Sequence, residues 1–231
     1  WKYSTFVLVA VVLLGSVFMF TGSSNSNAIN NGGGANEDPI DMDVFLDNPN
    51  LYPSIGPNDA KNVVVELSDF QCSHCGIASG IPSWTEDYST APHYNSAGSA
   101  KQAAKNGEIR FIYVPLAFLG QESVYAAQSV LCANQQGKFW EMHDAIFEAS
   151  TTPQGNDGKY SKANLKGIAS GINGLDTNEF NNCLDSDETV SDVQRATANV
   201  QSMGIQIGTP KFFVNGEKVQ STWDSIQAAF V

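Results

Sequence analysis

The sequence has little positive charge. It holds 12 lysines and arginines against 24 aspartates and glutamates, which gives a formal net charge of −12 at pH 7. Nucleic-acid binding depends on clustered Lys and Arg side chains that neutralise phosphates, so this composition argues against a nucleic-acid partner. The acidic balance indicates little else, because a negative surface mainly favours solubility.

Cysteine and histidine, the usual ligands of structural zinc, are also few, with four and three residues. A closed zinc site takes four such ligands. Cys72 and Cys75 could supply half of one, but Cys132 and Cys183 stand alone on predicted helices. We therefore expect no metal and no other bound cofactor.

Apolar residues are not scarce. They make up 42% of the chain, with 13 Phe, 7 Tyr and 4 Trp, which is enough for a packed core and argues against disorder. Residues 6–20 (FVLVAVVLLGSVFMF) form an uncharged run preceded by Lys2, typical of an export signal or a membrane anchor. The run is slightly short of the roughly 20 residues that span a bilayer comfortably. A buried helix of a soluble core is the plain alternative.

The sequence also contains a small-x-small pattern at Ser26-Asn27-Ala28, where a signal peptidase could cleave. We favour a retained anchor, with secretion or periplasmic release after cleavage as the alternative. Both place the rest of the chain outside the cytosol, where disulfides persist. Residues 22–36 are mostly Ser, Asn and Gly, as in a flexible tether, and residues 37–57 are acidic with prolines.

The clearest motif is Cys72-Ser73-His74-Cys75, which follows the short β-branched run Val63–Ser68. A Cys-x-x-Cys pair between a strand and a helix is typical of redox chemistry. The first cysteine then sits at a helix N-terminus, where unpaired N–H groups and the helix dipole favour a thiolate. The second lies one turn away, within reach of a disulfide. A plain structural disulfide or half of a zinc site is the alternative.

The remaining pattern predicts a strand over Ile109–Val114 and several helices between residues 124 and 203. A hairpin over 211–220 follows, with Asn215-Gly216 at its turn, and a closing helix near Trp223. The order of strand, Cys-x-x-Cys helix, strand, helical block, hairpin and helix is that of an α/β thioredoxin fold with an inserted helical domain. We expect five regions: residues 1–21 signal or anchor, 22–57 linker and acidic approach segment, 58–118 first part of the fold, 119–203 helical insertion, and 204–231 second part.

Three stretches resemble the DsbA-like thiol-disulfide oxidoreductases: Val63–Cys75, Gly137–Phe147 and Gly208–Gly216. The second belongs to the branch with a Gly-Lys-Phe-Trp-Glu-Met-His-Asp motif. Together they span nearly all of residues 61–220. The chain departs from the family in its longer polar segment between Pro82 and Asn106, and in having Ser73 where the family often has Pro.

The resemblance implies roles for four further residues. His74 would favour the Cys72 thiolate, although a solvent-facing bystander is possible. The Thr209-Pro210 bond would be cis and face the cysteine pair, whereas base rates alone predict trans. Glu66 would be a partly buried acid that exchanges a proton with Cys75; a strand-end carboxylate reaching solvent is the alternative.

Cys132 and Cys183 are expected to form a structural disulfide, because an exported chain with an even cysteine count favours pairing and the related branch often carries such a bridge. Two separate buried thiols are the alternative. Three residues of the insertion read as helix core rather than a binding surface: Phe139, Trp140 and Met142. Asp69 reads as a turn or cap group, and His93 and His143 show no partner.

We expect an exported enzyme that donates its Cys72–Cys75 disulfide to folding, cysteine-containing proteins through a mixed disulfide. By analogy with the family, a membrane quinone-linked thiol oxidase would recharge it. A reductase or isomerase would use the same residues in reverse, and redox poise distinguishes the two. A membrane-tethered, redox-inactive chaperone-like subunit is a third possibility, which the intact motif argues against.

Overall fold

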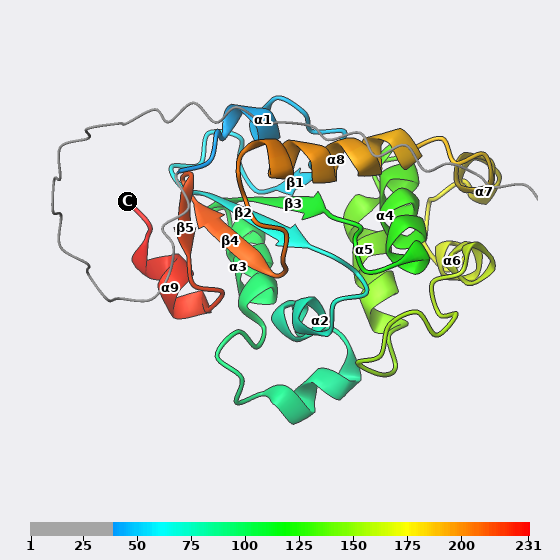
Figure 1. The fold of residues 1–231 in the computed structure, drawn as a ribbon, viewed down its shortest axis with the longest axis horizontal. Coiled ribbons are helices and arrows are strands. Elements are labelled where there is room, and N and C mark those ends of the chain that lie inside the picture. Colours follow the sequence, from blue (N-terminus) through cyan, green and yellow to red (C-terminus); the bar gives the residue numbers. More distant parts are fainter. Residues whose placement is uncertain (1–38) are drawn as a thin grey trace, which may run out of the picture. The chain divides into compact units, whose positions relative to one another are not determined.

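The structure, a computed structural model, describes residues 39–231. The chain divides into two units, residues 1–35 and 36–231, and the description that follows concerns the second (Figure 1). The predicted signal or anchor at residues 6–20, the cleavage pattern and the tether all lie outside the described residues. None of the described helices is both long enough and apolar enough to cross a membrane.

A five-stranded sheet forms the centre of the unit, in the order β1-β3-β2-β4-β5 (Figure 1). Strands β2 and β3 are parallel, while β1 pairs antiparallel with β3 and β4 pairs antiparallel with both β2 and β5. The strands are β1 (Ser54–Ile55), β2 (Val63–Ser68), β3 (Arg110–Pro115), β4 (Lys211–Val214) and β5 (Glu217–Val219). The parallel pair with an antiparallel hairpin beside it is the sheet of a thioredoxin fold.

The two faces of the sheet are covered by different helices, because side chains along a strand alternate between faces. Val65 and Leu67 of β2 pack in one core with α8 (Val190–Ser202) and α1 (Asp43–Leu46). Val64 packs in the opposite core with α3 (Ser96–Lys105) and α9 (Trp223–Ala228). Glu66 follows Val64 by two positions and therefore points to the α3 side.

A third core is formed by the helical insertion, which follows β3 and precedes α8 in the chain. Its helices are α4 (Gln121–Asn134), α5 (Phe139–Glu148), α6 (Lys162–Ala169) and α7 (Thr177–Asp185). Helix α8, which the sequence assigns to the same insertion, packs on the sheet instead: Val193, Ala196 and Val200 share a core with Val65 and Ile112. The predicted fold class, a thioredoxin fold with a helical insertion, is confirmed.

The globular unit begins earlier than the sequence suggests. Residues 40–57, read as an acidic approach segment, carry the buried side chains of Phe45, Leu51 and Tyr52. These three side chains belong to the core on the α8 face, and β1 adds an edge strand beside β3. The few apolar residues of this segment are spread among acidic ones, so the sequence pattern does not reveal that the segment packs against one face of the sheet.

Two short elements complete the surroundings of the motif. Helix α2 (Ser73–Ser79) ends at Gly80, whose φ of 66° provides a left-handed cap before Pro82 is reached. The 3₁₀ helix η1 (Ser83–Tyr88) follows and leads through a turn to α3. At the hairpin, Asn215 and Gly216 both have positive φ, as the predicted tight turn requires.

Candidate active site

The Cys-x-x-Cys motif lies where β2 turns into α2. Cys72 is the N-cap of α2, with extended backbone angles, and its carbonyl oxygen accepts hydrogen bonds from the amides of Cys75 at 3.0 Å and Gly76 at 3.1 Å. The first amides of a helix have no partner within it, so they point toward the N-cap side chain. The Cys72 side chain makes no capping hydrogen bond, but its sulfur lies where the backbone amides of His74 and Cys75 stabilise a negative charge.

Cys72 is partly exposed and its thiol is acidic. Its pKa is lowered to about 6, chiefly by the hydrogen bond from the Cys75 thiol and further by the backbone amides of Cys75 and His74, while partial burial opposes the shift. A thiol with a pKa of 6 is mostly thiolate at neutral pH. Cys72 therefore combines access with nucleophilicity.

Cys75 has the opposite properties. It is fully buried, and burial raises its pKa well above the ordinary value, with the charges of Cys72 and Glu66 acting in the same direction. Both cysteines are free thiols in the structure. The pair is therefore asymmetric, with one sulfur at the surface that ionises readily and one inside that does not.

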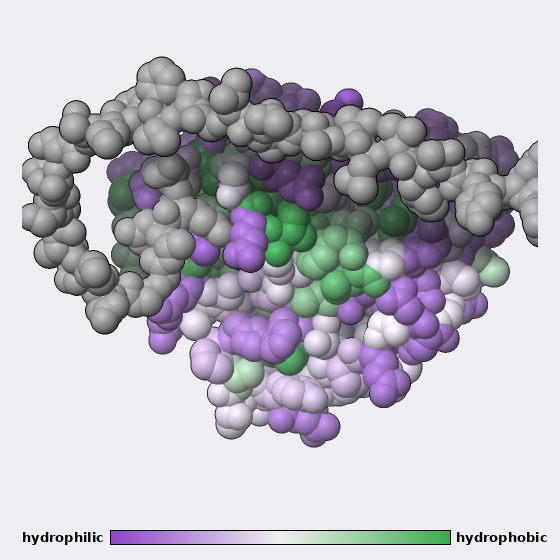
Figure 2. Space-filling model, in the orientation of Figure 1, coloured by the Kyte–Doolittle hydropathy of each residue, from purple (hydrophilic) through white to green (hydrophobic). Residues whose placement is uncertain are grey.

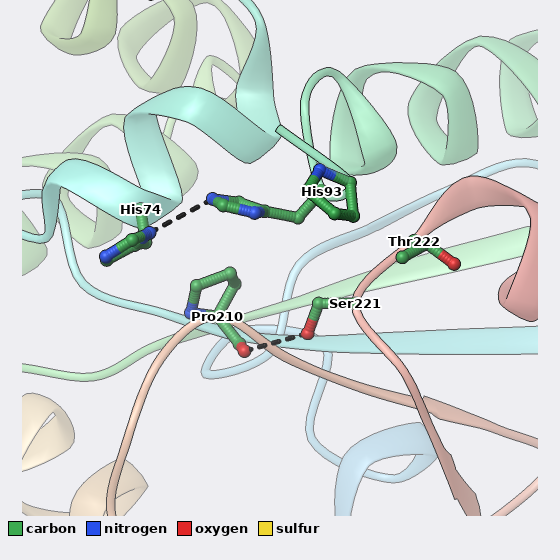
Figure 3. A pocket seen from close by; sticks show the side chains of 6 residues that line it. His74, His93, Pro210, Ser221 and Thr222 are labelled. Carbon is green, nitrogen blue, oxygen red and sulfur yellow. Dashed lines mark hydrogen bonds between the residues drawn. The ribbon is translucent and has the colours of Figure 1, made fainter. Parts of the chain in front are cut away.

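The Thr209-Pro210 bond is cis and lies opposite the motif. The Thr209 carbonyl oxygen is 3.4 Å from the Cys72 sulfur, so the backbone of the loop before β4 directly contacts the thiol. Pro210 lines an open pocket of about 370 Å³ together with His74 and His93 (Figure 3). Its carbonyl oxygen accepts a hydrogen bond from the Ser221 hydroxyl at 3.0 Å.

Glu66 is buried beneath the motif. Only 2% of the residue is exposed, which excludes the alternative of a strand-end carboxylate in solvent. Burial raises its pKa to about 8, while the Ser68 hydroxyl and the Lys101 ammonium oppose the rise. Glu66 is therefore mostly protonated at neutral pH. It lies close enough to Cys75 that its negative charge, once it ionises, raises the pKa of that thiol.

Lys101 of α3 connects this interior to the surface. It lines a small cavity together with Glu66 and His143, and its ammonium pairs with the Asp144 carboxylate. Asp144 is one-third exposed, and its carboxylate Oδ1 also lies 2.8 Å from Nδ1 of His143, from which it can accept a hydrogen bond. Sequence reasoning missed Lys101, because its helix is polar and irregular in pattern and gives no signal that one lysine points inward.

His74 has a partner that the sequence does not reveal. Its Nδ1 lies 3.1 Å from Nε2 of His93, in the segment between η1 and α3 (Figure 3). Both rings line the pocket beside Pro210. Their separation of 19 residues across a turn and a 3₁₀ helix gives no recognisable spacing, so only the fold brings them together.

The other residues considered in the sequence are structural. The Asp69 carboxylate accepts hydrogen bonds from the Gln71 and Phe118 amides and the Ser123 hydroxyl, as a turn group does. His143 is buried among aromatic rings, and burial lowers its pKa. Phe139 and Met142 are buried in the insertion core, and Trp140 packs against that core from a half-buried position.

Cys132 and Cys183 are joined by a disulfide between α4 and α7, with their Cα atoms 5.9 Å apart. Neither residue is more than 3% exposed. Among the described residues, no group of three or more His, Cys, Asp or Glu side chains is placed to hold a metal ion.

Comparisons with known proteins agree with this geometry. A thioredoxin family model matches residues 90–230, which is more than half of the chain, although the match begins after the Cys-x-x-Cys motif. A probable disulfide bond formation protein D of Bacillus anthracis is 24% identical over 76% of this chain and 75% of its own length. A thioredoxin-like oxidoreductase structure from Silicibacter pomeroyi has a TM-score of 0.62 and 26% identity, covering 82% of this chain and 95% of that one.

A second kind of relative is much longer. A Na(+)/H(+) antiporter NhaA of Herminiimonas arsenicoxydans is 28% identical over 82% of this chain, yet the chain spans only about a quarter (27%) of that protein. The fold, the motif at the start of α2 and the shared sequence lead to one family. The chain belongs to the thioredoxin family, and it is similar to proteins named as a thioredoxin-like oxidoreductase and a disulfide bond formation protein.

Proposed function

We propose that this protein is an extracytoplasmic thiol oxidase that donates its Cys72–Cys75 disulfide to folding, cysteine-containing proteins. The observation that carries the proposal is the asymmetry of the pair: the accessible Cys72 has a pKa of about 6, and the buried Cys75 has a pKa well above its ordinary value. An acidic first thiol stabilises the reduced enzyme, and a stable reduced form makes the disulfide a strong oxidant.

The size of this effect follows from the pKa. Relative to a thiol with the ordinary value of 9.0, a pKa of about 6 stabilises the reduced form at pH 7 by roughly a factor of ten, or about 30 mV for a two-electron couple. The shift makes the protein more oxidising than an otherwise identical enzyme without an acidic Cys72.

In the first step, a substrate thiolate attacks the Cys72 sulfur of the enzyme disulfide. The Cys72–Cys75 bond breaks, a mixed disulfide forms at Cys72, and the bonding electron pair leaves on Cys75. Because Cys75 is buried and its pKa is raised, its thiolate is a poor leaving group unless it gains a proton. Glu66, protonated at neutral pH and beneath the motif, donates that proton.

In the second step, another thiolate of the substrate attacks the substrate sulfur of the mixed disulfide. The Cys72 thiolate leaves readily, because its pKa is low, and the substrate gains a disulfide while the enzyme keeps two electrons as a dithiol. The Thr209 backbone, in contact with the Cys72 sulfur, would hold an extended substrate by strand-like pairing. Figure 2 shows apolar side chains gathered between α8 and α2 on this face, which suits an unfolded substrate.

Each turnover leaves the enzyme reduced, so an oxidant must recharge it. A membrane quinone-linked thiol oxidase fits this need, and tethering of the domain by residues 6–20 would keep it close to such a partner. The long relatives support a place beside a membrane, because in them a region like this chain is part of a protein named as an antiporter.

The reduction potential measured against a glutathione buffer tests the proposal. We expect a value well above about −270 mV, the potential of thioredoxin. A potential near that value, together with efficient reduction of a test disulfide, would favour the second candidate, a reductase or isomerase that uses the same pair in reverse.

A further inference from the structure

The connection between α5 and α6 lies beside the cysteine motif (Figure 1). Residues 151–160, called here the α5–α6 segment, contain turns and bends but no helix or strand. Thr152 and Gln154 of this segment line a narrow cleft together with Cys72. The segment therefore forms a wall next to the reactive cysteine.

The cleft behind this wall is nearly filled. Its volume is about 10 Å³, whereas the pocket lined by Pro210 has about 370 Å³, and the two share no lining residue. A volume of about 10 to 15 Å³ holds at most one water molecule, so no substrate side chain fits into the cleft. The larger pocket begins at the loop whose Thr209 carbonyl contacts the Cys72 sulfur. A substrate can therefore approach Cys72 past Pro210 but not past the α5–α6 segment.

Gln71, which directly precedes Cys72, ties the segment to the motif. Its side chain is buried, and its Oε1 accepts a hydrogen bond from the Asn156 amide of the segment at 3.0 Å. Its Nε2 donates to Oε2 of Glu122, in the first turn of α4, at 3.2 Å. Both ends of the amide are thus used, and one side chain links the motif, the segment and the insertion.

Glu122 holds the far end of the segment. Its two carboxylate oxygens accept hydrogen bonds from the amides of Gly158 at 2.7 Å and Tyr160 at 2.9 Å. Tyr160 is buried, and its hydroxyl donates to the Ile146 carbonyl of α5 at 3.1 Å. The position of the segment is therefore set by hydrogen bonds to fixed elements, rather than by its own secondary structure.

The sequence of the segment permits its close approach to the motif. A Cβ atom at Gly155 would lie 2.7 Å from Oε1 of Gln71 and 3.3 Å from the Gln71 carbonyl oxygen. The first of these distances is too short for any side chain, so a larger residue at 155 would displace the Gln71 amide or the segment itself. Glycine is thus required for the segment to lie this close.

We propose that the α5–α6 segment determines substrate specificity: it blocks one side of Cys72, so that an extended, unfolded chain reaches the sulfur along the Thr209 backbone while folded proteins are excluded. A chain that pairs as a strand needs only about 5 Å beside that backbone, whereas a folded surface must also cover the neighbouring elements. Gln71 and Glu122 are positioning residues, since they act by holding the segment. The inference rests on the proposed disulfide exchange at Cys72.

Two probes that carry the same reactive group test this access. A 2-thiopyridyl disulfide is placed either on the cysteine of a short unstructured peptide or on a surface cysteine of a small folded protein. The Cys72 thiolate of the reduced enzyme attacks the cysteine sulfur of the probe and forms a mixed disulfide. The probe disulfide breaks, and its leaving thiolate takes a proton from water to give 2-thiopyridone, which is measured by absorbance. Because both probes react with one thiolate, the ratio of their rates is independent of the pKa of Cys72.

The two variants release the segment from opposite ends of the contact. Gly155→Ala disturbs it from the segment, and Gln71→Met removes both hydrogen bonds of the amide while keeping a side chain of similar length. In each variant, the rate with the folded-protein probe should rise roughly three- to tenfold and the rate with the peptide probe by less than about twofold, because exchange depends on access. The double variant should add little, since both changes free the same segment.

Gly167→Ala on α6 is the matched control, because a Cβ there would meet no atom within 4 Å. It should keep the wild-type ratio. A ratio that is unchanged in both Gly155→Ala and Gln71→Met would overturn the inference. Equal acceleration of both probes would overturn it as well, since general loosening of the fold has that effect. Neither outcome depends on the reduction potential, so the test can fail while the oxidase proposal holds, and the reverse.

Discussion

The four cysteines form two pairs in opposite surroundings. Cys132 and Cys183 are 51 residues apart, and their disulfide is buried in the insertion core between α4 and α7. Cys72 and Cys75 are three residues apart at the start of α2, and the first of them is partly exposed beside the cis-proline loop. The same side chain is thus a fixed cross-link in one place and a reactive group in the other.

The difference has two physical sources. Closing a loop of about 50 residues removes much entropy from the unfolded chain, whereas closing a loop of three or four removes far less. The long-range bridge is therefore the more strongly stabilising one. Accessibility also separates the two pairs. Thiol–disulfide exchange needs an attacking thiolate to reach the disulfide, and Cys132 and Cys183 are both buried.

The largest expected effect comes from the reactive pair itself. Cys72→Ser should abolish disulfide transfer, because the accessible, acidic sulfur is lost. Cys75→Ser should instead accumulate mixed disulfides at Cys72, since no internal thiol remains to resolve them. Non-reducing gels and mass spectrometry of adducts with a disulfide-containing peptide measure both. Equally abundant adducts at Cys75 in Cys72→Ser would reverse the assignment of the two roles.

Removing the Cys132–Cys183 disulfide should lower the stability of the fold without changing its redox chemistry. Replacing both Cys132 and Cys183 by Ala should lower the free energy of unfolding by about 4 kcal/mol, the chain-entropy value for a loop of this length. Denaturant titration of the oxidised protein measures the loss. The reduction potential of Cys72–Cys75 should stay unchanged, and a clear shift in it would show that the insertion disulfide takes part in the redox chemistry.

Glu66 sharpens the comparison, because this buried acid lies beside the reactive pair. Its folded-state pKa is raised from 4.5 to about 8, so between these values the folded protein holds a proton that the unfolded chain has released. Its contribution to stability therefore falls as pH rises from about 5 to 8, by about 1.4 kcal/mol per pH unit.

Glu66→Gln should remove this slope. Subtracting the unfolding free energies of the variant from those of the wild type, both reduced, at several pH values isolates the effect of the one group. The variant should also exchange disulfides more slowly, because the proton donor for Cys75 is missing. A difference that does not vary with pH would mean that Glu66 is ionised in the folded protein.

The smallest effect is expected at Lys101. Its ammonium lowers the pKa of Glu66, so Lys101→Gln should raise that pKa further, by about half a pH unit. The carboxyl carbon resonance of Glu66 followed by NMR against pH reports the change. Lys105→Gln, on the same helix but exposed, should leave the titration unaltered. A downward shift in Lys101→Gln would exclude this electrostatic role.

Strongly patterned regions could be predicted well from sequence. The run from Val63 to Ser68 is apolar, short and followed by a turn, and it matches β2 residue for residue. The Asn215-Gly216 turn and the stripe that starts at Val190 also correspond to the hairpin and to α8. The segment at 40–57 could not be recognised, because its buried residues do not follow a helical or strand period.

The sequence by itself determined the chemistry that is available: two cysteines at a spacing that permits a disulfide, placed after a strand where a helix must begin. Local rules suffice for this, since capping and the reach of one helical turn involve only neighbouring residues. Only the tertiary structure decided which groups surround that pair. The burial of Glu66, the approach of the Thr209 carbonyl and the contact between His74 and His93 depend on segments far apart in the chain, and their distances and desolvation exist only once the sheet and its helices have packed together.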